Sequence, residues 1–212
     1  MLIERRSLLL GTALLAADAA WAAAPLLVTP RETVGPFYPE AVDDDFADLT
    51  RVGGQPKRAS GPAIELRGRV LTTAGASVPQ AMVLVWQANA AGRYAHSADT
   101  STLPLDPAFR GHALVRTGKD GAFRLLTVMP GAYRAPLPTG MRTPHLHFEV
   151  LGANSRLVTQ MYFPGQKLNG SDRLIARAKA EGRDPRRMMA EAAVSSEPGV
   201  SGYRWDVVLA KG

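Results

Sequence analysis

The stretch that decides the fold is Arg142-Thr143-Pro144-His145-Leu146-His147-Phe148-Glu149-Val150. Two histidines stand one residue apart at the head of an apolar run that favours a β-strand. In a strand, residues two apart point to the same face, so His145 and His147 present two imidazoles side by side. Such a pair either binds a metal ion or forms ordinary hydrogen bonds on a half-exposed strand. The rest of the chain decides between these two interpretations.

Further strands are expected along the chain. Apolar runs of strand length, separated by Gly- and Pro-containing turns, predict strands at residues 63–71, 81–87, 111–117, 122–128, 145–151, 157–163 and 203–210. About seven short strands of this kind indicate an all-β fold, an antiparallel β-sandwich. Near the C-terminus, residues 171–193 look helical and Pro185 divides them. Residues 88–110 and 129–143 are long loops in which a rigid sandwich would build its site.

The composition limits the function. The chain has 212 residues and no cysteine. It therefore suits one domain with a targeting segment, and any metal must be held by nitrogen and oxygen ligands. The net charge is +6, with lysine and arginine scattered along the chain. We therefore expect no nucleic-acid partner, and the mildly positive field favours an anionic small substrate.

The first 24 residues are typical of a signal peptide. Arg5 and Arg6 precede a short apolar stretch, which is too short for a stable membrane anchor, and small residues follow. The arginine pair indicates the twin-arginine route, which exports folded proteins; an ordinary secretory peptide is the alternative. We expect residues 1–24 to be removed, leaving residues 25–212 as a periplasmic or secreted domain without a membrane anchor.

Two tyrosines in the predicted loops add to the histidine pair. Tyr94 and Tyr133 are potential phenolate donors, and a phenolate is a hard, anionic oxygen ligand. Together with imidazoles it suits ferric iron better than zinc or copper(I). A strong Lewis acid would also lower the phenol pKa enough for both tyrosines to bind as phenolates. Loop tyrosines also pack as amphipathic lids, so the spacing alone does not establish a metal site.

Several ordered blocks resemble the intradiol ring-cleavage dioxygenases, and among them the protocatechuate 3,4-dioxygenase branch. The matching blocks are residues 85–94, 103–111, 120–133, 142–148, 159–163 and 203–209. The resemblance implies that Tyr94, Tyr133, His145 and His147 bind Fe(3+). It also implies that dioxygen cleaves a catechol-type aromatic diol, giving a cis,cis-muconate-type diacid. The partners would be the diol and dioxygen.

The resemblance also assigns catalytic roles. Tyr133 would leave the metal as the diol binds and act as a base. Arg142 would stabilise negative charge on the substrate. Gln160 would hydrogen-bond near the reacting oxygens, or serve as a structural strand residue. Ala135 stands where the family commonly has a bulky aromatic residue, which puts the substrate in doubt.

The oligomeric state also stays open. Protocatechuate dioxygenases pair two different subunits, whereas only one chain is visible here, so a homo-oligomer is one expectation. Catechol and hydroxyquinol dioxygenases carry a helical dimerisation segment before the sandwich, and we expect none in this chain.

Two other functions fit parts of the pattern. One is a secreted β-sandwich module that binds aromatic or carbohydrate ligands and has a non-catalytic metal site. The presence of all four ligand residues argues against it. The other is a zinc hydrolase, but two tyrosines stand where a carboxylate or a third histidine is usual.

Replacing Arg5 and Arg6 by lysine should leave the precursor in the cytoplasm, because the arginine pair is what the folded-protein export route recognises. Immunoblots of cytoplasmic and periplasmic fractions from cells expressing each form measure the outcome. Mature protein in the periplasm of a strain that lacks this route would show that the segment is an ordinary secretory peptide.

Overall fold

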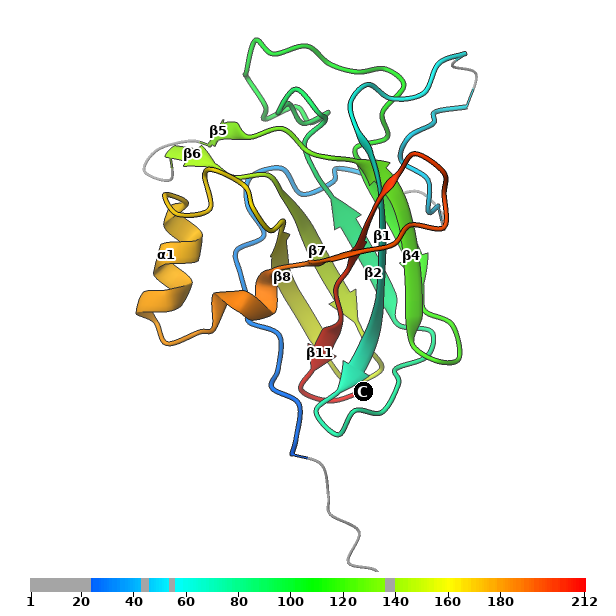
Figure 1. The fold of residues 1–212 in the computed structure, drawn as a ribbon, viewed down its shortest axis with the longest axis vertical. Coiled ribbons are helices and arrows are strands. Elements are labelled where there is room, and N and C mark those ends of the chain that lie inside the picture. Colours follow the sequence, from blue (N-terminus) through cyan, green and yellow to red (C-terminus); the bar gives the residue numbers. More distant parts are fainter. Residues whose placement is uncertain (1–23, 43–45, 54–55, 136–139) are drawn as a thin grey trace, which may run out of the picture.

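The chain forms a sandwich of two β-sheets with a short helix at one side (Figure 1). The computed structural model describes residues 24–42, 46–53, 56–135 and 140–212. The predicted all-β sandwich is confirmed. The signal peptide expected over residues 1–24 lies, apart from its last residue, outside the described residues. Within the described part of the chain, no helix is long and apolar enough to cross a membrane.

The first sheet is built around the long strand β1 (Ala63–Thr72). β4 (Ala122–Val128) pairs with it antiparallel. β10 (Ser201–Arg204) and β11 (Val207–Leu209) pair in parallel with successive parts of β1, and β9 (Glu191–Ala193) pairs antiparallel with β10. This sheet is therefore mixed, where antiparallel pairing was expected. The whole second sheet lies between β1 and β10 in the sequence, so no tight turn forces these strands to run in opposite directions.

The second sheet is entirely antiparallel and carries the histidine pair. Its strand order is β3-β2-β7-β8, with bounds His112–Arg116 for β3, Met82–Trp86 for β2, His145–Leu151 for β7 and Arg156–Tyr162 for β8. These strands match the predicted runs to within one residue at each end. β7 is a central strand of this sheet, so both of its edges are hydrogen-bonded.

The core lies between the two sheets, and alternation along β7 defines which residues enter it. Leu146, Phe148 and Val150 are fully buried and pack there with apolar residues of β1, β2, β4 and β8. Because side chains alternate along a strand, His145 and His147 point to the opposite face of the second sheet. The histidines therefore lie on the outer face of the sandwich.

That outer face is covered by loops and by a segment near the N-terminus. Residues 29–38, which we call the cover segment, run along β8, with Glu32 N donating to Val158 O at 2.9 Å. A second apolar cluster on this face contains Phe37, Leu84, Trp86, Ala88, Tyr94, Tyr133, Ala135 and Val158. The histidines are consequently buried although they do not face the main core.

The helical prediction over residues 171–193 is only partly correct. α1 covers Arg173–Ala180, and a short 3₁₀ helix, η1, covers Pro185–Met188. Residues 191–193 form β9 instead, because pairing with β10 outweighs the helical preference of an alanine-rich run. The strand predicted over residues 203–210 is likewise divided into β10 and β11.

Candidate metal centre

The centre begins with residues that lie opposite one another on three strands. In register, His147 of β7 faces Trp86 of β2 on one side and Gln160 of β8 on the other. His145 faces Tyr162 of β8. The indole of Trp86 stacks on His147 with ring centroids 4.9 Å apart and an angle of 11° between the planes. This stack orients the imidazole of His147.

Two glycines bring the tyrosine-bearing loops into contact. Gly92 has a φ of +89°, and a Cβ built there would lie 2.3 Å from Ala132 O. A Cβ at Gly131 would lie 2.4 Å from Gly92 N. Neither position therefore accepts a side chain without movement of the other loop. The close approach places Tyr94, two residues after Gly92, beside Tyr133, two residues after Gly131.

A short hairpin within residues 129–143, expected to be an irregular loop, holds Tyr133 next to Arg142. β5 (Tyr133–Ala135) pairs antiparallel with β6 (Gly140–Arg142), and Tyr133 is the register partner of Arg142. The sequence gives little sign of such short strands. The hairpin aligns a predicted ligand with the predicted charge-stabilising residue.

All four predicted metal ligands converge at one point. The ring centroids of Tyr94 and Tyr133 are 5.2 Å apart, those of Tyr133 and His145 are 5.6 Å apart, and those of His145 and His147 are 4.9 Å apart. The four side chains are buried, with exposed fractions between 1% and 5%. Residues up to 53 positions apart in sequence (94 to 147) thus form one cluster.

Hydrogen bonds leave the histidines ready to bind a cation. His145 Nδ1 lies 2.6 Å from the Thr143 carbonyl, so it carries the proton and Nε2 presents a lone pair. The Nε2 atoms of His145 and His147 are 3.2 Å apart. With metal–nitrogen bonds of about 2.1 Å, two adjacent ligands of one ion lie at about this separation. The pair therefore has the geometry of two ligands of a single ion.

The protonation states of the two histidines and the two tyrosines also fit a metal site. Burial lowers the pKa of both His145 and His147 well below its ordinary value, and the positive charge of Arg142 lowers it further. Both imidazoles are then neutral at neutral pH. Burial raises the pKa of Tyr94 and Tyr133 above the ordinary value. The phenols therefore stay protonated unless a strong Lewis acid displaces their protons.

An unpaired buried atom and the donor types both fit ferric iron. Within the described residues, the Tyr94 hydroxyl is buried without a hydrogen bond. Buried polar atoms normally have partners, so such an atom in a candidate site needs an explanation such as an ion. In the described part of the chain, no three or more His, Cys, Asp and Glu side chains are grouped so that they could hold a metal ion by themselves. Apart from the two histidines, the donors that converge here are the phenols of Tyr94 and Tyr133, which suit ferric iron.

Arg142 is held by a buried network behind the ligands. Its Nε donates to Asp172 Oδ2 at 2.8 Å, and its Nη2 donates to Gln160 Oε1 at 2.7 Å and to the Tyr162 hydroxyl at 3.2 Å. The Tyr162 hydroxyl also donates to Gln160 Oε1 at 3.1 Å. The predicted pair Arg142 and Gln160 is thus in direct contact. The guanidinium is fixed in orientation before any ligand binds.

Asp172 and Tyr162 were not predicted as part of this site. Asp172 is the N-cap of α1 and accepts from Leu174 N and Ile175 N through Oδ1. Its N-cap role is visible in the sequence, but its ion pair with Arg142 links residues 30 positions apart. His96, two residues after Tyr94, bonds Tyr38 O through Nε2 at 2.9 Å and accepts from Ala98 N through Nδ1.

Comparison with known proteins identifies the class. The family model described as Dioxygenase matches residues 34–211. The chain is 38% identical to the protocatechuate 3,4-dioxygenase beta chain of Burkholderia cepacia over 189 residues, which covers 87% of this chain and 80% of that one. The chain belongs to the intradiol ring-cleavage dioxygenase family and is by class an enzyme. The resemblance to the protocatechuate dioxygenase branch is confirmed.

Other relatives match this chain over different shares of their own length. Catechol 1,2-dioxygenase 1 of Acinetobacter lwoffii is 32% identical over 158 residues, 68% of this chain but 49% of that protein. The chain thus spans about half the length of this relative. Among solved structures, the dioxygenase domain of a dioxygenase–carbohydrate-binding fusion from Streptomyces sp. SirexAA-E superposes with a TM-score of 0.65 and 26% identity, covering 87% of this chain and 99% of that one.

Asp172→Asn should lower the free energy of unfolding by about 3–5 kcal/mol, the usual cost of breaking a buried ion pair. Asparagine is an equally good N-cap. Its side-chain N–H₂ group, however, would replace one carboxylate oxygen and face a hydrogen-bond donor that Asp172 now accepts from. Urea denaturation measures the change. The matched control is Asp184→Asn, which alters the N-cap of η1 and its surface pair with Arg186, and it should cost about 1 kcal/mol or less. Equal losses would show that Asp172 acts only as a cap.

Proposed function

We propose that the protein is a ferric-iron-dependent intradiol dioxygenase that converts a catechol-type aromatic diol and dioxygen into a cis,cis-muconate-type diacid. The observation that carries this proposal is the convergence of Tyr94, Tyr133, His145 and His147 on one buried point. Two phenols and two neutral imidazoles form a donor set suited to ferric iron. Membership of the family supports the same reaction class.

The residues around this point would have different roles in the reaction. Bound Fe(3+) would supply the Lewis acidity that activates the diol toward dioxygen. Tyr94, His145 and His147 would hold the ion throughout, and the Tyr133 oxygen would take up a proton from the incoming diol. Arg142 would stabilise negative charge that develops on the substrate. Its contacts with Asp172, Gln160 and Tyr162 support this role, because they fix the guanidinium in advance.

The relatives and the N-terminal sequence also bear on the substrate, the partners and the location. The relatives are named for protocatechuate, catechol and hydroxyquinol, so we propose a substrate of this class. Ala135, buried with Tyr133 in the second apolar cluster, would place a small residue near the substrate. Both a beta and an alpha chain of protocatechuate dioxygenase are similar to this chain, which supports an oligomer as the working form. Export by the twin-arginine route would allow iron to be loaded before the folded chain leaves the cytoplasm.

The purified mature protein should contain about one iron per chain, show the broad visible absorption of iron-bound tyrosinate, and consume dioxygen with at least one catechol. A panel of catechol, protocatechuate, hydroxyquinol and chlorocatechol, followed with an oxygen electrode and by product identification, tests this. Tyr94→Phe should shift the visible band, since it removes one phenolate. Iron-loaded protein that stays colourless and inactive would favour the binding-module alternative.

Arg142→Met should leave the iron content near one per chain but lower kcat by about a hundredfold or more, the usual scale for losing one preorganised charge-stabilising group. The variant also leaves Asp172 without its ion-pair partner, so its stability should fall as well. Asp172→Asn is therefore the control, because it breaks the same ion pair but keeps the guanidinium. Steady-state oxygen uptake compares them. A kcat of Arg142→Met that stays near the wild-type value while its stability falls would show that Arg142 contributes through stability alone.

A further inference from the structure

The cover segment touches the candidate metal centre at several points, and two of them lie at Gly35 and Thr33. A Cβ built on Gly35, whose φ is +75°, would lie 3.0 Å from Cε1 of His147. The Thr33 carbonyl accepts a hydrogen bond from Gln160 Nε2 at 3.1 Å. The position of this segment therefore affects both a predicted ligand and the residue that contacts Arg142.

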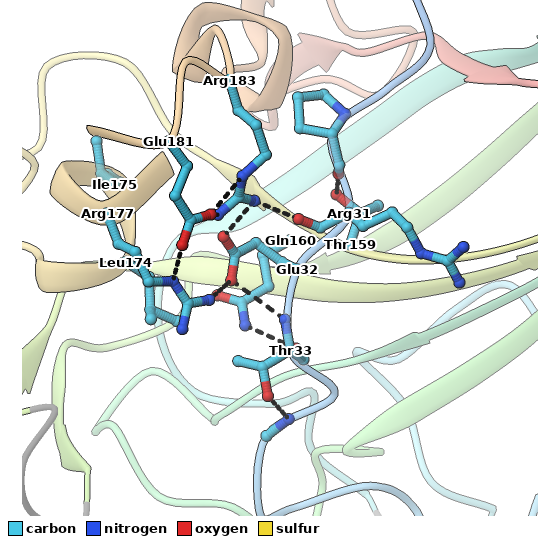
Figure 2. Close-up of polar contacts among 12 residues, drawn as sticks. Arg31, Glu32, Thr33, Thr159, Gln160, Leu174, Ile175, Arg177, Glu181 and Arg183 are labelled. Atoms are coloured by element: carbon cyan, nitrogen blue, oxygen red, sulfur yellow. Dashed lines mark hydrogen bonds and ion pairs between the residues drawn. The ribbon is translucent and has the colours of Figure 1, made fainter. Parts of the chain in front are cut away.

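One buried carboxylate anchors the segment to α1 and to the residues that follow this helix (Figure 2). The Glu32 side chain is 0% exposed, and it accepts from Arg177 Nη2 and from Arg183 Nη1, each at 2.8 Å. Arg177 belongs to α1, and Arg183 follows it closely. Glu181 completes the group, with an oxygen 2.6 Å from Arg183 Nη2 and another 3.8 Å from Arg177 Nε. Two carboxylates and two guanidiniums thus form a neutral quartet.

Stability alone does not account for this arrangement. Burying a carboxylate costs hydration, and apolar residues of similar size often cover a surface as well or better. The quartet fixes the orientation of the Glu32 carboxylate, because one arginine binds each of its oxygens. The backbone N–H of Thr33 also donates to Oε2 at 3.1 Å. The peptide unit that follows Glu32 is thereby held in a single orientation. Its neighbour is the Thr33 carbonyl, which contacts Gln160.

We propose that Glu32 is a positioning residue for the active site: its ion pairs with Arg177 and Arg183 hold the cover segment so that the Thr33 carbonyl orients the Gln160 side-chain amide. The inference deepens the proposed function and rests on it for its turnover measurement, whereas its other two measurements stand without it.

The amide orientation matters because of what surrounds Gln160. Its Nε2 donates to Thr33 O, while its Oε1 accepts from Arg142 and from the Tyr162 hydroxyl. If the Thr33 carbonyl moved away, Nε2 would lose its acceptor, and only the contacts of Oε1 with Arg142 and Tyr162 would hold the amide. A flipped amide would present its N–H₂ group to the guanidinium of Arg142, and two donors would then face each other. Arg142 would lose one of the contacts that orient it.

Amide hydrogen exchange tests the anchoring step. In Glu32→Gln, the peptide covering residues 29–38 should exchange at least tenfold faster than in the wild type, while peptides from β7 and β8 keep their rates. The matched control is Glu181→Gln, which removes the other carboxylate of the quartet but has no contact with the cover segment. It should change the exchange by less than twofold. Arg177→Gln, on a half-exposed helical face, is the second variant and serves where Glu32→Gln folds poorly. It should give an increase in exchange between those of Glu32→Gln and Glu181→Gln. Unchanged exchange in both Glu32→Gln and Arg177→Gln would overturn the proposal.

A double-mutant cycle tests the step to Gln160 without any need for activity. Glu32→Gln and Gln160→Leu are made singly and together. Their combined effect on the unfolding equilibrium constant should differ from the product of the single effects by at least fivefold, because Thr33 contacts both side chains. Additive effects would overturn the coupling.

Turnover provides the third measurement. With the best substrate from the oxygen-uptake panel, Glu32→Gln should lower kcat at least tenfold and change KM less than threefold, whereas Glu181→Gln leaves both within twofold. If Glu32→Gln loosens the cover segment but turnover stays within twofold, the positioning role is overturned. A wild-type protein without iron or turnover would refute the proposed function instead, and the exchange and double-mutant results would still decide the coupling.

Discussion

The structure depends on the alternation of side chains along one central strand, β7. Leu146, Phe148 and Val150 fill the core between the sheets, and the intervening His145 and His147 must therefore face outward. A shift of one residue in the pairing of β7 would place imidazoles in the apolar core and leucine at the metal centre. Since both edges of β7 are hydrogen-bonded, the core packing that stabilises the sandwich also defines the position of the site.

Placing the site on the outer face creates a requirement for burial. Loops, the hairpin β5–β6 and the cover segment enclose the histidines there. Contacts made by small or charged residues hold these elements in place. Gly92 and Gly131 allow the tyrosine loops to meet, and Asp172 holds Arg142 from the end of α1. The result is a buried, polar and largely hydrogen-bonded cluster outside the main core, in which charges act more strongly than at an exposed surface.

Much of this could be predicted from the sequence, because it depends on local patterns. The strand runs up to residue 163, the shared face of His145 and His147, and the loop that carries Tyr94 all follow from periodicity, turns and motif spacing. The parallel pairing of β1 with β10 and the roles of Asp172 and Glu32 could not be predicted. They depend on contacts between residues far apart in sequence, and a single aspartate or glutamate carries no mark of the arginine it will meet. The strand β9 was missed because tertiary pairing overrides the helical preference of its alanines.

The contact between Gly92 and Gly131 has a consequence for how such an enzyme changes over time. Because the two tyrosine loops interlock through their backbones, neither can be exchanged for the loop of a relative unless the other is exchanged with it. The pair would be inherited, and would have to be transplanted, as one unit. Variation in substrate choice would then be tolerated more readily at positions beside this contact, such as Ala135, than within it.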